Sequence, residues 1–246
     1  MLRHRSLLKD NSRIIGSAHS EPMDETEVHM GKEKNIAVTI SRQMGSGGSY
    51  VGYLAAKELG WRYVDREVLQ LAAERLGTNT RALEELDEKS LGILKNIIRG
   101  FSFSILETAY VPPMTQPIYD RDLFSLECKI MNQIIDEGSA VIIGRGGFHA
   151  LKDRPGLIRI FLHAPKEFRV NRIMTVGNMK SRREALAQVE ESDRTRAKFI
   201  GDMIGVNWTD ARNYHLSVDS STVDFATSVE MIIKLVNRKR ALLGKE

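Results

Sequence analysis

Small residues gather at one point of the chain, in the order Gly45, Ser46, Gly47, Gly48 and Ser49. A run of this composition allows successive backbone N–H groups to turn toward one point, and a helix that begins near Ser49 adds the positive end of its dipole. Together these groups form a nest that suits the phosphates of a nucleotide, with the Ser49 hydroxyl placed to hold Mg²⁺. Loops of this type ordinarily read Gly-Lys-Ser here, and Gly48 replaces the lysine.

Two other interpretations of this loop stay open. A dinucleotide-binding turn needs the pattern Gly-x-Gly-x-x-Gly, which runs through Gly45 and Gly47 but meets Tyr50 at its third glycine. The acidic residue that such a site needs after a second strand is matched only loosely, by Asp65. The segment also reads as a plain flexible glycine turn, although a mononucleotide phosphate loop accounts best for its position between a strand and a helix.

Arginines stand at several points where a phosphate could be bound. Arg145 lies in "IIGRGG", directly after an apolar run, where it can clamp a phosphate with two parallel hydrogen bonds. The alternative is an arginine paired with an acidic neighbour. Arg169 and Arg172 lie three residues apart on one helix face, and so do Asp193 and Arg196. A solvated, charged helix is the alternative for these residues.

The elements that must position these residues alternate along the chain. Short β-branched or apolar runs predict strands over residues 35–41, 61–65, 139–147, 157–164 and 214–221. Apolar residues spaced by three and four predict helices over 49–60, 66–77, 80–100, 121–138 and 225–243, with a long polar helical region over 165–200. This alternation predicts a mostly parallel sheet covered by helices on both faces, with the ligand at the carboxyl ends of the strands.

Composition limits the class of protein. Of the 246 residues, 42% are hydrophobic and 28% charged, and the net charge is +4, which is typical of a globular protein that handles small anions. Cys128, the single cysteine, excludes an internal disulfide and fits a buried thiol of a helix. No apolar run is long enough to span a membrane, and we expect a cytoplasmic protein. Residues 1–34 show no sustained period and predict a flexible extension to a domain over residues 35–246.

Three stretches give the chain a family resemblance over roughly residues 35–240. "AVTISRQMGSGGSYVGYLAAKELGWRYVDREVL", "VIIGRGG" and "IRIFLHAPKEFRVNRI", in this order and spacing, resemble the cytidylate kinase-like proteins, which are relatives of the P-loop nucleoside monophosphate kinases. The resemblance implies a three-layer P-loop kinase fold with a central parallel sheet of five strands, an NMP-binding insertion and a lid. It also implies phosphoryl transfer from ATP, with Mg²⁺, to a nucleoside monophosphate such as CMP or dCMP.

The resemblance assigns roles to residues already singled out. Cytidylate kinases have Gly-Arg-Asp after the equivalent strand, and Gly144-Arg145-Gly146 is similar without the aspartate. Their lid motif ends in an aspartate and an arginine, matched here by Asp193 and Arg196, whereas its first arginine is Val189. We therefore expect acceptor binding by Asp65, Arg145 and Asp193. Arg42, Arg172 and Arg196 are the candidates for the catalytic cation that Gly48 does not supply.

Other functions stay open beside the kinase. The missing lysine and the incomplete lid motif are also typical of a nucleotide-binding pseudokinase or regulatory protein with little catalysis. Nucleic-acid binding by the basic segments "KSRREALAQ" and "NRKRALLGKE" is not favoured, because no aromatic residue is interleaved with the charges. The sequence does not define the oligomeric state, and its histidines show no metal-ligand spacing.

Overall fold

The computed structural model of the chain describes residues 34–66, 69, 72–73 and 121–245. The chain divides into two compact units, Met1–Lys32 and Glu33–Glu246, and the described residues belong to the second. The predicted extension over residues 1–34 lies outside the described residues except for Lys34, so its boundary with the domain stays a prediction. The predicted helix over 80–100, most of the helix over 66–77 and the NMP-binding insertion also lie outside them.

In the described part of the chain, five parallel strands form one sheet in the order β2-β3-β1-β4-β5. The central strand pairs with a neighbour on each side, so that Ala37 lies opposite both Ala140 and Leu157. The predicted α/β fold with a central parallel sheet is confirmed. The strands are β1 (Ala37–Arg42), β2 (Arg62–Val64), β3 (Ala140–Ile143), β4 (Leu157–His163) and β5 (Leu216–Asp219).

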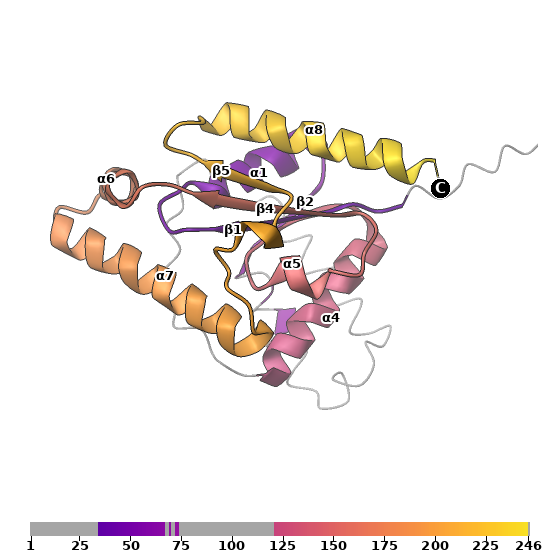
Figure 1. Cartoon of the computed structure of the whole chain (residues 1–246), viewed down its shortest axis with the longest axis horizontal. Coiled ribbons are helices and arrows are strands. Elements are labelled where there is room, and N and C mark those ends of the chain that lie inside the picture. The colour runs from indigo at the N-terminus through magenta and orange to yellow at the C-terminus, as the bar shows by residue number, and fades with distance from the viewer. Residues whose placement is uncertain (1–33, 67–68, 70–71, 74–120, 246) are drawn as a thin grey trace, which may run out of the picture. The chain divides into compact units, whose positions relative to one another are not determined.

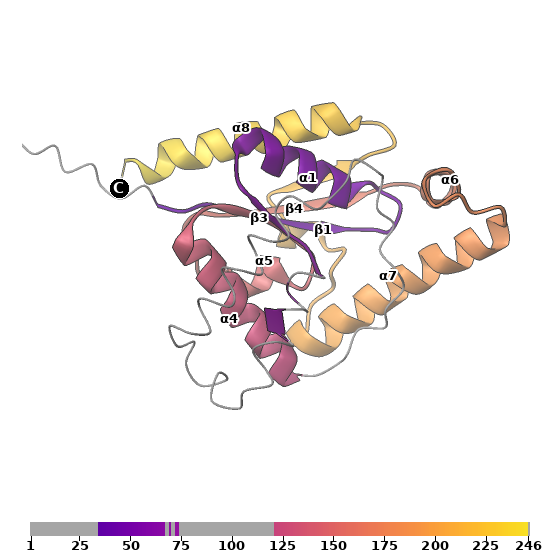
Figure 2. The ribbon, with the colours of Figure 1, turned by 180° about the vertical axis from the view of Figure 1, so that it is seen from behind.

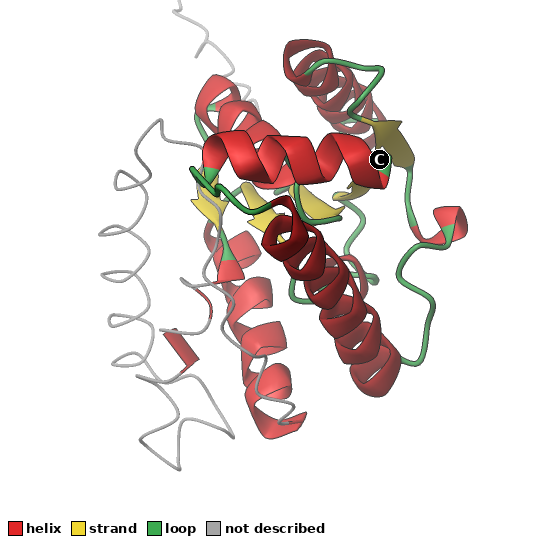
Figure 3. Ribbon diagram, turned by 90° about the vertical axis from the view of Figure 1, so that its left-hand side faces the viewer, coloured by secondary structure: helices red, strands yellow, loops and turns green. Residues whose placement is uncertain are grey.

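Helices cover both faces of this sheet. Helices α1 and α8 lie on one face, and α4 and α5 lie on the other (Figure 1). Figure 2 shows the same two layers from behind, and Figure 3 shows the strands between them. No helix in the described part combines the length and the apolar character that a membrane span requires. The helices are α1 (Gly48–Leu59), α4 (Arg121–Glu137), α5 (Gly147–Ala150), α6 (Lys166–Val176), α7 (Arg182–Ile204), the 3₁₀ helix η2 (Ala211–Asn213) and α8 (Phe225–Leu243).

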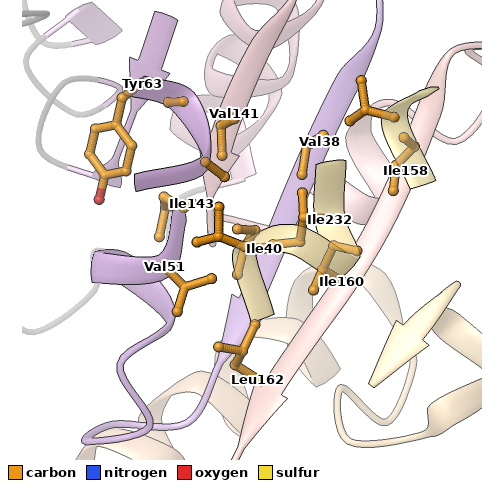
Figure 4. Close-up of a cluster of buried hydrophobic side chains, with 14 of the residues drawn as sticks. Val38, Ile40, Val51, Tyr63, Val141, Ile143, Ile158, Ile160, Leu162 and Ile232 are labelled. Atoms are coloured by element: carbon orange, nitrogen blue, oxygen red, sulfur yellow. The ribbon is translucent and has the colours of Figure 1, made fainter. Parts of the chain in front are cut away.

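The strands are apolar on both faces because each face supports its own hydrophobic core. Val141 and Ile143 of β3 pack with α1 and α8, in the cluster that Figure 4 shows around Ile40 and Val51. The alternate residues Ala140 and Ile142 pack with α4 on the opposite face. Side chains alternate across a strand, so the continuous apolar runs of the sequence fit a doubly covered parallel sheet.

The polar stretch over residues 165–200, predicted as one helical region, is two helices. Helix α6 ends before Gly177, and α7 begins after Ser181. The Ser181 side chain accepts a hydrogen bond from the Glu184 N–H at 3.3 Å, which satisfies one of the free amides of the new helix. The chain therefore turns between the two helices, and Figures 1 and 2 both show α7 running from α6 toward α4.

Cys128 lies in α4, packed against the core on that face of the sheet. Burial raises the pKa of its thiol to about 11, and the neighbouring Glu127 adds to the effect. We expect iodoacetamide at pH 8 to alkylate Cys128 at least about 100-fold more slowly in the folded protein than in urea. Raising the pKa from 9.0 to about 11 lowers the fraction of reactive thiolate by about this factor. Mass spectrometry of timed aliquots measures both rates, and equal rates would contradict the buried position.

Candidate active site

The loop over residues 43–47 joins the carboxyl end of β1 to the first residue of α1. Gly45 and Gly47 both adopt left-handed backbone angles, with φ values of 82° and 79°. Among the described residues, the N–H groups of Gly45, Gly47, Gly48 and Ser49 have no hydrogen-bond acceptor. The first turn of α1 also holds no acidic side chain that would neutralise the positive end of its dipole. The loop therefore presents free amide donors to an anion.

Glycine is required in this loop because its walls lie so close. A Cβ atom at Gly45 would stand 2.6 Å from the Arg169 carbonyl oxygen, and one at Gly47 would stand 2.5 Å from the Phe225 ring. The Ser46 side chain is fully buried and donates to the Gln43 carbonyl at 2.8 Å. Ser46 thus fixes the loop from behind, and its hydroxyl is not available to a ligand.

Asp193 of α7 and Arg169 of α6 hold the peptide groups of Met44. The Met44 N–H donates to Asp193 Oδ1 at 3.1 Å, and Arg169 Nη1 donates to the Met44 carbonyl at 3.1 Å. Arg169 Nη1 also donates to Asp193 Oδ2 at 2.6 Å, and Arg169 Nε donates to the Ala164 carbonyl at 2.9 Å. We call these three residues, Met44, Arg169 and Asp193, the loop latch. It connects α6 and α7 to the backbone of the loop.

Arginine side chains converge beside the loop with few negative charges to balance them. Burial lowers the pKa of Arg42, and Tyr63 and Asp65 oppose this effect. Burial also lowers the pKa of Arg196 to about 9, and the charge of Arg42 lowers it further. Arg196 Nη1 is buried without a hydrogen bond, 3.6 Å from Asp193 Oδ1. An anion that binds among these guanidinium groups reduces the repulsion between their positive charges.

Arg172, the remaining predicted cation, lies on the other side of the loop. Its guanidinium stands over the Phe225 ring, 4.8 Å from the centroid, and Phe225 in turn packs on Gly47 and on the ring of Tyr50. Burial lowers the pKa of Arg172, and Tyr50 opposes the shift. Asp65 directly follows β2, and its charge acts on Arg42. The structure therefore brings the predicted cations and acids together around one loop.

Arg145 is paired with an acidic residue, which is the alternative that the sequence leaves open. Its Nε donates to both carboxylate oxygens of Glu127, at 2.9 and 2.8 Å, and its Nη2 donates to Glu127 Oε1 at 2.6 Å. The guanidinium also lies 4.6 Å from the centre of the Phe199 ring. Nη1 makes no hydrogen bond to a described residue. It is the one group of Arg145 left for a ligand.

Sequence reasoning missed Glu127 and Met44 as parts of the site, and it considered Arg169 as a phosphate ligand rather than as a partner of Met44 and Asp193. The sequence did contain an indication for Glu127, because this residue lies on the apolar face of α4 beside Leu126 and Ile130. A charged side chain in such a position requires a partner of opposite charge. Glu127 is fully buried, and burial raises its pKa against the opposing charge of Arg145. Met44 carried no comparable signal, and the sequence did not indicate the partners of Arg169, because both roles depend on groups far away in the chain.

Known proteins resemble the chain in family and in fold. The model of the cytidylate kinase-like family matches residues 37–222. The crystal structure of an uncharacterized protein from Eubacterium ventriosum ATCC 27560 has the same fold, with a TM-score of 0.61 and 20% identity over 82% of this chain and 98% of that chain. A shikimate kinase from Acinetobacter baumannii in complex with shikimate is 14% identical over 84% of this chain and 95% of its own, with a TM-score of 0.42. No curated protein matches the chain.

Proposed function

We propose, from the premise that this chain belongs to the cytidylate kinase-like family, that it transfers the γ-phosphoryl group of ATP to a nucleoside monophosphate. CMP or dCMP is the first candidate acceptor. The observation that carries the proposal is the loop between β1 and α1, whose N–H groups at Gly45, Gly47, Gly48 and Ser49 have no acceptor among the described residues and lie at the positive end of α1. Donors fixed in this way hold a polyphosphate without having to reorganise.

The site suits Mg²⁺ held mainly by the substrate. No cluster of three or more His, Cys, Asp or Glu residues that could hold a metal occurs in the described part of the chain. Mg²⁺ in kinases is typically bound by one or two protein oxygens, by waters and by the phosphates of the nucleotide. The hydroxyl of Ser49, at the second residue of α1, makes no hydrogen bond to a described residue and is the proposed protein ligand. Mg²⁺ would neutralise part of the phosphate charge.

The remaining residues divide between the acceptor and the transferred group. In this proposal Arg145 Nη1 and Asp65 contact the acceptor, because both follow strands that end beside the loop. Arg172 and Arg196 approach from α6 and α7 and neutralise charge on the phosphoryl group. Asp193 has both oxygens engaged by Met44 and Arg169. We therefore assign Asp193 to positioning the loop rather than to direct contact with the acceptor.

The test is ADP formation from Mg-ATP with CMP, dCMP, UMP, AMP and a control without acceptor. Acceptor-dependent turnover is expected, with CMP or dCMP preferred. In the variant Arg145→Lys, we expect the KM for the acceptor to rise at least about tenfold while the KM for ATP is unchanged. Lysine keeps a positive charge beside Glu127 but loses the free Nη1, so this variant is preferable to alanine.

Two outcomes would contradict the proposal in different ways. An unchanged acceptor KM in Arg145→Lys would remove Arg145 from the acceptor site. Tight binding of Mg-ATP without turnover of any acceptor would contradict the kinase activity, and it would support the nucleotide-binding regulatory protein that the missing lysine also fits.

A further inference from the structure

The phosphate loop departs from the usual pattern at two positions, not one. When the pattern Gly-x-x-x-x-Gly-Lys-Ser/Thr is laid on Gly47 and Ser49, its lysine falls on Gly48 and its first glycine falls on Arg42. The glycine and the basic residue have thus exchanged places. The positive charge has moved from the first residue of α1 to the last residue of β1.

The structure shows that these two positions share one space. A Cβ atom at Gly48 would stand 2.5 Å from Arg42 Cβ and 3.0 Å from Arg42 Cγ, closer than side-chain carbons approach. A side chain at position 48 and the arginine at position 42 therefore exclude each other. The Cβ and Cγ atoms of Arg42 therefore lie against Gly48, the first residue of α1, where the lysine of the usual pattern would stand.

A second glycine gives room to the other end of Arg42. A Cβ atom at Gly144, which follows β3, would stand 2.1 Å from Arg42 Nη1. Gly144 has a φ of 74°, so the backbone there favours glycine in any case. The side chain of Arg42 thus extends from the N-terminus of α1 to the turn that contains Arg145, along the carboxyl ends of β1 and β3.

The guanidinium of Arg42, like that of Arg172, is left for a ligand, whereas two neighbouring arginines are engaged by protein groups. Arg169 donates to the Met44 carbonyl and to Asp193, and Arg145 donates three hydrogen bonds to Glu127. The side chain of Arg42 makes no hydrogen bond or ion pair with a residue that the structure describes, although the charge of Asp65 acts on it. A half-buried guanidinium without such partners favours an anion as its counter-charge.

We propose that Arg42 does the work of the missing lysine and binds the β- and γ-phosphate oxygens of the nucleotide from the end of β1. This inference rests on the proposed function and names the residue that makes it possible. In the transfer, an acceptor phosphate oxygen bonds to the γ-phosphorus while the bond from that phosphorus to the bridging oxygen breaks. The electron pair of the broken bond stays on the oxygen of ADP, where Arg42 stabilises the growing charge.

The first test removes and restores the charge at position 42. Arg42→Gln keeps much of the side-chain length without the charge, and we expect it to weaken Mg-ATP binding about 10- to 100-fold by calorimetry. The loss is larger for ATP than for ADP, because ADP lacks the γ-phosphate. Arg42→Lys recovers part of the affinity. Arg212→Gly, which removes an exposed arginine of η2, is the matched control and binds as the wild type does.

The second test returns the two residues to the usual pattern. Gly48→Lys alone is expected to lower the melting temperature, because the new side chain overlaps Arg42. Arg42→Gly combined with Gly48→Lys is expected to bind Mg-ATP at least about tenfold more tightly than Arg42→Gly alone, a strongly non-additive result. If the double variant bound Mg-ATP no more tightly than Arg42→Gly, the idea that the two residues have exchanged places would be wrong. If Arg42→Gln bound Mg-ATP with wild-type affinity, Arg42 would not bind the phosphates.

These affinities are measured without an acceptor, so they separate this inference from the proposed function. If no nucleoside monophosphate is turned over but Arg42→Gln still loses ATP affinity, the role of Arg42 in binding is supported and the kinase activity is not. If turnover is present and Arg42→Gln retains both kcat and ATP affinity, the kinase activity stands and Arg42 is not its cation.

Discussion

Replacing Glu127 with methionine is expected to lower the free energy of unfolding by about 3–5 kcal/mol, because it leaves the charge of Arg145 buried without a partner. Glu127 is fully buried, and Arg145 donates three hydrogen bonds to its carboxylate. Methionine preserves the length and volume of the side chain, so lost packing contributes little. Urea denaturation followed by circular dichroism measures the change.

Two further variants define the origin of this loss. Asp136→Asn, on the same helix, breaks an exposed pair with Arg154 and should cost less than about 1 kcal/mol. Glu127→Met combined with Arg145→Met should recover most of the stability, because an apolar pair of similar volume replaces a buried ion pair at little cost. If Glu127→Met lost no more stability than the Asp136 control, the buried pair would not matter to the fold.

The variant Asp193→Asn should lower kcat about 100-fold, because a shift of the phosphate loop by about 1 Å misplaces the reacting groups. The Met44 N–H and Arg169 Nη1 donate to different oxygens of Asp193, and asparagine replaces one of these oxygens with an NH2 group that cannot accept. The loop latch then loses one of its bonds. We expect affinity for Mg-ATP to fall about tenfold in calorimetry.

Asp202→Asn is the matched control for the latch. Asp202 lies on the same helix, α7, and forms an exposed pair with Lys198. Its removal should leave kcat and ATP affinity at wild-type values. If Asp193→Asn lowered the melting temperature but bound Mg-ATP as the wild type does, Asp193 would stabilise α7 without positioning the loop.

The sheet and the glycine-rich loop between β1 and α1 could be predicted from local sequence. Strand β1 is an apolar, β-branched run that needs cover on both faces, and the run from Gly45 to Ser49 follows it directly. Both features depend on neighbouring residues, so periodicity and composition were sufficient. The break between α6 and α7 was missed, although Ser181 and Glu184 have the spacing of a helix N-terminus.

The partners of the site residues could not be predicted in the same way. Asp193 binds the backbone of Met44, and these residues lie 149 positions apart in the chain. The course of Arg42 depends on Gly144, which directly follows another strand, β3. Such pairs are created by the order of the strands in the sheet, and a single sequence carries no record of which strands become neighbours.

The crossing of Arg42 over Gly48 and Gly144 also restricts how this loop can evolve. Starting from the present chain, a Cβ atom at position 48 overlaps Arg42 Cβ, whereas one at position 144 overlaps only the terminal Nη1 of Arg42, which can move. A single substitution at position 48 is therefore hindered as long as Arg42 is present, whereas a paired change at 42 and 48 removes the overlap. We expect positions 42 and 48 to change together when this chain diverges.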